Sequence, residues 1–384
     1  MITEYNVFVP SIMGSGSSLR TGLEVKKLGC RKALVVFDKG LKNVGISDKI
    51  VENLENAGIQ TVSFDGVLPD PPDTVVEEAA QMAKSEEIDC IVAIGGGSSM
   101  DTAKGINVLM NNTPPIMKYF GVQKNLNPGV PLVFIPTTSG TGSEVTNMCV
   151  ISCESLGKKD SVISDVCVGT LAILDPELTL GLPPKLTAAT GVDALSHAVE
   201  SITGGHSNPL SDALARDAIR TIAKWLPIAY KDGSNIEARE NLLYASMFAG
   251  MAFTNALVHV GHAIGHTLGA KFHIPHGTAV AISLPEVIEY AAKTEHVKVK
   301  MICEALGAQV PIDATPEEIG KIGKMALRKL IKSVDIPNLK DLGISLEEAM
   351  GTAPMASQDA GLALAPYRIT GGKIADIIKS AYDA

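Results

Sequence analysis

The first 180 residues alternate short apolar runs with segments of helical periodicity, and this alternation is the strongest constraint on the fold. Residues 32–38, 59–65, 90–96 and 131–138 have the composition of buried strands, and residues 46–58 and 72–87 have the spacing of amphipathic helices. Alternation of this kind predicts a parallel sheet with helices on both faces. From about residue 182 onward strand-like runs nearly vanish, and helical periodicities begin with residues 183–202.

The change of pattern predicts two domains, an α/β domain at residues 1–181 and an all-helical domain at residues 182–384. A chain of 384 residues agrees with this division, since domains usually hold about 100–200 residues. Hydrophobic residues make up 46% of the chain and charged residues 20%, which excludes a disordered protein. The net charge of −9, without a polybasic run, argues against a nucleic-acid or anionic-membrane partner.

We expect neither export nor a membrane span. Six scattered cysteines form no CxxC pair, and the opening MITEYNVFVP lacks a basic segment followed by an apolar one, so we expect a reducing cytoplasm. Residues 241–270 contain no Asp, Glu, Lys or Arg. That stretch is long enough to cross a bilayer. Its asparagines and histidines would be costly in lipid, so we expect a helix buried in protein.

Two glycine-rich turns follow predicted strands. In IGGGSSMDTAKG (residues 94–105), glycines would let the backbone approach a phosphate, and the following helix would offer free N–H groups. The alternative is a plain strand-to-helix turn with Ser99 as N-cap. PTTSGTGSEVT (residues 136–146) is the second turn, and two such turns at the carboxyl ends of strands favour a ligand crevice.

Asp38 ends the first strong strand. An acidic residue there accepts hydrogen bonds from both ribose hydroxyls of NAD and repels the 2′-phosphate of NADP. An ordinary turn aspartate is the alternative interpretation.

Five residues of the helical half have the types and spacing of a metal site. Asp193 and His197 are four apart on one predicted helix, His262 and His266 are four apart in the uncharged segment, and His276 follows in HIPHG. Buried imidazoles without partners cost free energy. One aspartate with three histidines would suit Fe²⁺ or Zn²⁺ with a position open for a substrate oxygen. Hydrogen-bonded core histidines are the alternative.

With these motifs the chain resembles the iron-containing (group III) alcohol dehydrogenases over essentially its whole length. The most specific match is GHAIGHTLGAKFHIPHG, residues 261–277, and the two glycine-rich turns and residues 182–200 match as well. The resemblance implies a Rossmann-like dinucleotide-binding domain followed by an all-α metal-binding domain, the architecture of dehydroquinate synthase. It also implies a homo-oligomer.

The resemblance assigns roles to individual residues. It implies that Asp193, His197, His262 and His276 bind the metal, expected to be Fe²⁺ with Zn²⁺ as the alternative, and that His266 is a catalytic residue between metal and nicotinamide. The residues expected to bind NAD are Asp38, Asp70, Gly96, Gly97, Ser98, Asp101, Thr137, Thr138, Ser143, Lys159, Leu178 and Leu182.

The sequence departs from the family pattern at three places. Many members have PNP where this chain has Pro69-Asp70-Pro71, a small residue where it has His259, and D-x-C…N-P-R where it has residues 359–367. The substrate pocket is predicted to include Met148, Phe253, His259 and Gly361. We expect His259, one helical turn before His262, to make that pocket more polar and to favour a substrate with a polar or anionic tail. A core histidine paired with a backbone carbonyl is the alternative.

The predicted activity is the interconversion of a small primary alcohol and its aldehyde, because a metal polarises the oxygen while NAD carries the hydride. An aldehyde reductase for substrates with an anionic tail is a narrower alternative. A lyase or cyclase like dehydroquinate synthase is another, although it would need a basic cluster beside the histidines for a phosphorylated substrate. The third alternative is a binding protein without catalysis.

Overall fold

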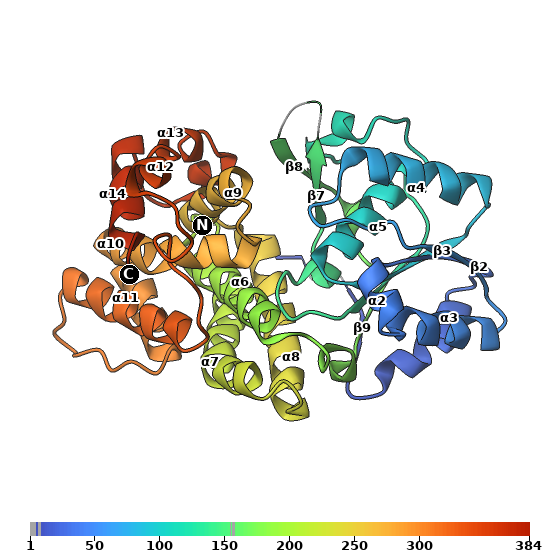
Figure 1. Ribbon diagram of the computed structural model, residues 1–384, viewed down its shortest axis with the longest axis horizontal. Helices are drawn as coiled ribbons and strands as arrows, with labels where there is room; N and C mark the ends of the chain where they lie inside the picture. Colours follow the sequence, from blue (N-terminus) through green and yellow to red (C-terminus); the bar gives the residue numbers. More distant parts are fainter. Residues whose placement is uncertain (1–4, 7–8, 154, 156–157) are drawn as a thin grey trace. The chain divides into compact units, whose positions relative to one another are not determined.

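The computed structural model describes residues 5–6, 9–153, 155 and 158–384 (Figure 1). Residues 1–4 and 7–8, part of the opening segment that argued against a leader, lie outside the described residues. The chain forms two compact units. We call Val7–Thr138 with Gly142–Leu180 the nucleotide unit, and Gly181–Ala384 with Ser139–Thr141 and Met1–Asn6 the helical unit.

The nucleotide unit is built on a parallel sheet. Among the described residues it has six strands in the order β1-β9-β6-β4-β2-β3, and all neighbours are parallel. The strands are β1 (Ser11–Met13), β2 (Lys32–Val36), β3 (Gln60–Phe64), β4 (Cys90–Gly95), β6 (Leu132–Pro136) and β9 (Leu171–Leu174). The predicted parallel sheet is thereby confirmed, and β1 and β9, of three and four residues, were not predicted.

Helices cover both faces of this sheet, as expected. Alternate residues of β2 point to opposite faces: Leu34 and Val36 belong to one hydrophobic cluster with α4 and α5, and Val35 belongs to another with α1 and α3. These helices are α1 (Thr21–Lys27), α2 (Lys39–Asn43), α3 (Ile46–Asn56), α4 (Asp73–Ser85) and α5 (Gly97–Met110). A second, small sheet that the sequence did not predict joins β5 (Gly121–Val122), β8 (Lys158–Ile163) and β7 (Met148–Cys153).

The strand order indicates where a ligand would bind. β3 lies on one side of β2, whereas β4 and then β6 lie on the other, so the order of strands reverses between β2 and β4. In open α/β sheets, ligands bind outside the carboxyl ends of the strands at such a point. Asp38 follows β2 and the glycine-rich turn follows β4, so both lie at this edge.

The helical unit contains no strand among its described residues. Its helices are α6 (Pro184–Thr203), α7 (Pro209–Lys231), α8 (Ile236–Ala256), α9 (Val260–Phe272), α10 (His276–Ala305), α11 (Pro316–Lys332), α12 (Leu346–Met350), α13 (Ala353–Ala356) and α14 (Gly371–Ala381). Three of them begin with reciprocal capping boxes, Asn208 with Ser211, Thr315 with Glu318 and Ser345 with Glu348. The main core of the unit lies where α6, α7, α8 and α10 meet.

The uncharged segment is not the single buried helix that we expected. It forms most of α8 and most of α9, two helices bent by 107° at a short break, and each buries most of its residues. Leu257 in the break has φ 63° and ψ 174°, a region that only glycine adopts readily. In the described part of the chain, no single helix has the length and hydropathy of a membrane span; only this bent pair does.

Candidate metal centre and nucleotide-binding edge

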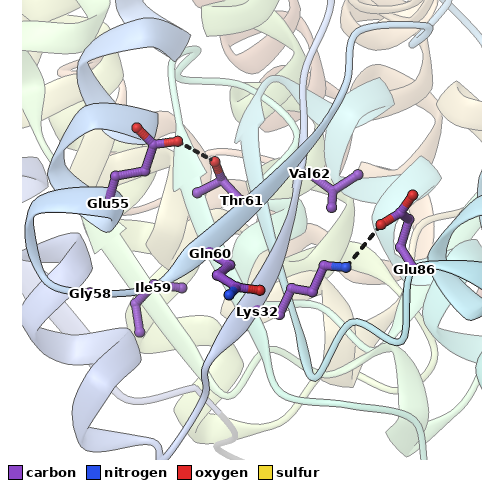
Figure 2. A pocket seen from close by; sticks show the side chains of 8 residues that line it. All are labelled: Lys32, Glu55, Gly58, Ile59, Gln60, Thr61, Val62 and Glu86. Atoms are coloured by element: carbon purple, nitrogen blue, oxygen red, sulfur yellow. Dashed lines mark hydrogen bonds and ion pairs between the residues drawn. The ribbon is translucent and has the colours of Figure 1, made fainter.

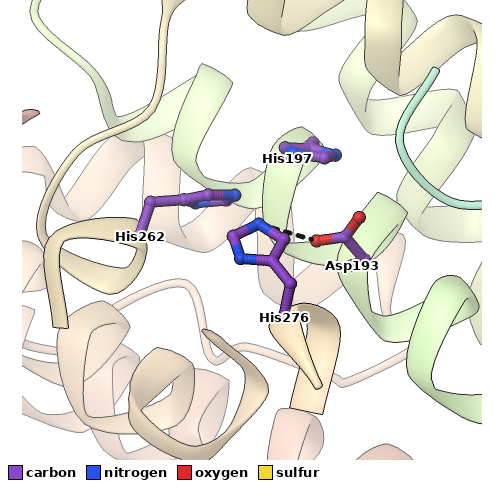
Figure 3. A group of neighbouring side chains, drawn as sticks. All are labelled: Asp193, His197, His262 and His276. Atoms are coloured by element: carbon purple, nitrogen blue, oxygen red, sulfur yellow. Dashed lines mark ion pairs between the residues drawn. The ribbon is translucent and has the colours of Figure 1, made fainter. Parts of the chain in front are cut away.

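Three helices bring together the four predicted metal ligands (Figure 3). Asp193 and His197 lie one turn apart on α6, His262 lies in the first turn of α9, and His276 is the first residue of α10. One potential ligand atom from each lies within 4.8 Å of those of the other three. Asp193, His197 and His262 are buried, whereas the side chain of His276 is 38% exposed.

The polar atoms of this cluster fit a divalent cation. Asp193 Oδ1, His197 Nδ1 and His262 Nε2 are buried and make no hydrogen bond with any described residue, although Asp193 Oδ1 lies 3.5 Å from His276 Nε2, the contact drawn as a dashed line in Figure 3. Burial raises the pKa of Asp193 to about 6, although the neighbouring His262 lowers it in part. Burial also holds the pKa of His197 well below its usual value. Such groups are costly to bury without a partner, and a metal bound by one carboxylate and three imidazoles would satisfy them.

His266 lies one turn beyond His262 on α9 and is not part of the four-residue cluster. Its ring stacks on that of His276 with 5.5 Å between ring centroids, and its Nδ1 lies 3.0 Å from Asp359 Oδ2. Burial alone would raise the pKa of Asp359, but the hydrogen bond with His266 lowers it. The side chain of His266 is 46% exposed, so a proton on this ring can reach solvent.

Two predicted pocket residues lie around this group. Phe253 on α8 is buried and stacks on His197 at 4.3 Å between ring centroids. Gly361 follows Asp359 closely, donates its N–H to Asp359 Oδ1 at 2.8 Å and is half-buried. Met148, at the start of β7 in the nucleotide unit, is half-buried, and its carbonyl accepts a hydrogen bond from Lys104.

The two glycine-rich turns lie side by side at the carboxyl ends of β4 and β6. Thr137 donates its N–H to the Gly95 carbonyl at 2.9 Å, and a Cβ on Gly96 would lie 3.1 Å from Thr138 Oγ1. α5 begins at Gly97, and its N-cap, Gly96, makes no side-chain capping bond. Ser99 is therefore not the N-cap that we considered, since it lies inside α5.

Two residues expected to bind NAD form hydrogen bonds with other residues of the protein. Ser143 Oγ donates to Asp101 Oδ1 at 2.9 Å, and Asp101 Oδ2 accepts the N–H of Val150 at 3.2 Å. The fully buried Lys104 donates to the hydroxyl and carbonyl of Ser143 and to Thr146 Oγ1. This network fixes the second turn against α5, and the sequence did not single out Lys104.

The other predicted NAD-binding residues occupy separate places. Asp38 Oδ1 caps α2 by accepting the N–H groups of Gly40 and Leu41. Asp70, at φ 51°, pairs with Lys159 at 2.6 Å, so the structure joins two residues that the sequence left far apart. Ser98 lies in the first turn of α5. Leu178 is partly buried against the core of the nucleotide unit. Leu182, in the helical unit, accepts a hydrogen bond from Arg239 through its carbonyl.

A further hollow, of about 600 Å³, lies at the amino ends of β2 and β3, the edge of the sheet opposite the glycine-rich turns (Figure 2). Four of its polar side chains are already paired, Lys32 with Glu86 at 2.8 Å and Thr61 with Glu55 at 2.7 Å. It therefore offers no chemistry comparable to that of the metal cluster.

Comparison with known proteins identifies the family. A family model for iron-containing alcohol dehydrogenases matches residues 10–176, and a model for the C-terminal part of the Fe-containing alcohol dehydrogenase family matches residues 187–382. The 1,3-propanediol dehydrogenase of Citrobacter freundii is 38% identical over 98% of this chain and 99% of its own, and the NAD-dependent methanol dehydrogenase of Bacillus methanolicus is 38% identical over the same shares. A crystal structure of 1,3-propanediol oxidoreductase superimposes with a TM-score of 0.95 at 37% identity, over 100% of both chains.

The chain belongs to the iron-containing alcohol dehydrogenase family. The predicted fold class is confirmed, and so is the predicted reaction class, a metal-dependent NAD-linked alcohol dehydrogenase. This membership favours a dehydrogenase over a lyase or cyclase on the same architecture. The predicted cofactors, NAD and iron, agree with the description of the family and with the NAD-dependent relative.

His259 does not line the substrate pocket of this dehydrogenase as we expected. Its side chain is fully buried behind His262, with Nε2 2.9 Å from Thr203 Oγ1 and Nδ1 3.2 Å from Glu200 Oε1. The prediction placed His259 on the α9 helix one turn before His262, whereas His259 is the N-cap of α9 with non-helical backbone angles. His259 therefore provides no argument for a polar or anionic substrate tail.

Sequence reasoning also missed Glu200 and Asp359, the carboxylates that contact His262 and His266. Glu200 had a signal that was available in the sequence. It is a charged residue three positions after His197, on a predicted helix whose other residues near that ligand are small or apolar. Asp359 lies in the stretch 359–367 that departs from the family pattern, but the chain between α13 and α14 has no clear periodicity that would assign Asp359 a role.

Proposed function

We propose that this chain oxidises a small primary alcohol, or reduces the corresponding aldehyde, with NAD(H) and a divalent metal held by Asp193, His197, His262 and His276. The observation that carries the proposal is the group of four residues whose potential ligand atoms lie within 4.8 Å of one another, three of which each hold a buried polar atom that makes no hydrogen bond with a described residue. Fe²⁺ is the expected metal and Zn²⁺ the alternative, since imidazole and carboxylate ligands suit both.

A metal at this site would polarise the substrate oxygen, and NAD would exchange a hydride with the carbon that carries it. Phe253 covers one face of His197 and keeps water away from it. His266 accepts the proton that the alcohol loses. Because Asp359 binds Nδ1 of His266, Nε2 is the nitrogen available to that proton, and the half-exposed ring returns the proton to solvent.

The proposal is tested by metal analysis and by NADH oxidation against a panel of small aldehydes, using protein purified without air. We expect about one metal ion per chain and NADH consumption that a chelator removes and added Fe²⁺ or Zn²⁺ restores. A metal-loaded protein that consumes no NADH with any aldehyde would contradict the proposal. An activity that survives complete removal of the metal would contradict it as well.

Asp38 is proposed to select NAD over NADP. Replacing it by glycine should raise the ratio of kcat/KM for NADPH to that for NADH by about 10–100-fold, because a hydrogen bond to a charged group contributes about 1.5–3 kcal/mol. Asp38→Asn is the matched control, because its amide oxygen can still cap α2 as Asp38 Oδ1 does. If neither variant changes the ratio, Asp38 acts only as a helix cap.

We further propose that the protein works as a homo-oligomer in the cytoplasm. The six cysteines are all free, which agrees with a reducing compartment. Sedimentation of the purified protein measures the size of the assembly directly.

A further inference from the structure

Glu200 is a fully buried carboxylate on α6, three residues after the ligand His197. Buried carboxylates are rare unless paired, and this one contacts two histidine rings and two backbone N–H groups, all from the start of α9. Its charge is therefore satisfied entirely inside the helical unit.

The first role of Glu200 is to cap α9. His259, the N-cap of that helix, makes no side-chain capping bond. Glu200 supplies the missing acceptor: Oε1 accepts the N–H of Gly261 at 2.6 Å, and Oε2 accepts the N–H of His262 at 3.1 Å. A negative charge at a helix N-terminus also interacts favourably with the helix dipole. Glu200 thus fixes the first turn of α9, which carries the ligand.

The second contact lies on the ligand itself. Glu200 Oε2 is hydrogen-bonded to Nδ1 of His262, while Nε2 of the same ring has no hydrogen-bond partner among the described residues and belongs to the buried group of atoms at the metal cluster. Because a carboxylate only accepts, Nδ1 carries a proton, which leaves Nε2 as the nitrogen whose lone pair a metal can use. This is the tautomer that a metal requires at Nε2.

We propose that Glu200 is a positioning residue for the metal, which holds the backbone, ring orientation and tautomer of His262, and that His259 supports it from the opposite side. This inference rests on the proposed metal site. Metal-binding histidines commonly donate their second N–H to a carboxylate, and loss of that partner weakens metal binding by about 10–100-fold.

His259 completes the arrangement. Its Nε2 is hydrogen-bonded with Thr203 Oγ1 at 2.9 Å, its Nδ1 lies 3.2 Å from Glu200 Oε1 in a close contact without hydrogen-bond geometry, and the ring has no exposed surface. It therefore acts on the metal only through Glu200. Gly261 leaves the necessary space, because a Cβ at that position would lie 3.1 Å from Glu200 Oε1.

The experiment compares Glu200→Gln with Glu286→Gln, measuring the Kd for Zn²⁺ by chelator competition and the visible spectrum of the Co²⁺-loaded protein. Glu286 is the matched control, since it is also buried in the helical unit but pairs with Arg328 and Lys324. We expect E200Q to raise the Kd about 10–100-fold and to shift the Co²⁺ bands. We expect E286Q to lower the Tm and to leave the Kd and the spectrum unchanged.

His259→Phe and the double variant E200Q/H259F test the supporting role. H259F alone should weaken Zn²⁺ binding, and in the E200Q background it should add little, because both changes act on one contact. If E200Q does not fold, H259F still tests the inference. Wild-type Kd values in E200Q and H259F would overturn it, whereas a wild-type protein that binds no Zn²⁺ or Co²⁺ would overturn the proposed function instead.

Discussion

Replacing His262 by alanine should abolish stoichiometric metal binding and lower aldehyde-dependent NADH oxidation by about 1,000-fold or more. His262 combines a buried Nε2 that faces the ligand cluster with an Nδ1 held by Glu200, so no other side chain can take its place. Loss of a single group that stabilises developing charge already costs about 100–1,000-fold in rate. Loss of the metal removes a larger stabilisation of the substrate oxygen.

Metal content by mass spectrometry and kcat/KM for NADH-dependent reduction measure this effect. His206→Ala is the control, because His206 is an exposed histidine of the same unit outside the cluster, and we expect it to keep full metal content and activity. A His262→Ala protein that retains one metal per chain and more than a tenth of the activity would refute the assignment of His262 as a ligand.

Gly277→Ala is expected to produce the largest loss of stability together with loss of the metal. A Cβ at Gly277 would overlap the Ala189 carbonyl oxygen on α6 and lie 2.9 Å from the Cβ of Asp193. The obstructing atoms belong to the helix backbone, so no side-chain rotation relieves the overlap. α6 and α10 would have to separate, which would move Asp193 away from His276. Overpacking of this kind costs about 1–3 kcal/mol or more.

Thermal denaturation should show a Tm lowered by about 5–10 °C, and metal titration should show a Kd raised at least about tenfold. Gly372→Ala is the matched control, since Gly372 lies in the helix α14 with no atom within 4 Å of an added Cβ. That variant should gain about 0.4–1 kcal/mol, because alanine restricts the unfolded chain. An unchanged Tm and Kd for Gly277→Ala would show that α6 and α10 do not pack through this glycine.

Long apolar runs made the main sheet predictable. β2, β4 and β6 are buried on both faces, so their sequences are almost continuously apolar and stand out from the helices between them. β1 and β9, with three and four residues, are too short to show a period. They become strands because β9 pairs with β6 and β1 pairs with β9. The break between α8 and α9 was equally hidden, since no proline or glycine marks Leu257.

The candidate site was likewise predictable only in part. Spacing of four residues placed Asp193 with His197 and His262 with His266, because one helical turn brings such side chains to one face. It did not distinguish His262, which joins the four-residue cluster, from His266, which pairs with Asp359. That distinction depends on the carboxylates that approach α9 from α6 and from the segment before α14.

Residue types and their spacing were therefore enough to predict the parallel sheet, the glycine-rich turns and the five residues that include the four-residue cluster, and the motifs were enough to indicate the family. Those features are local, or repeat with the period of one helix or strand. The packing of distant segments determined the rest: His259 lies behind the site instead of in its pocket, Glu200 holds His262, and Lys104 holds the second turn. Such contacts join residues 39–62 positions apart, and no local pattern encodes which buried charge meets which partner.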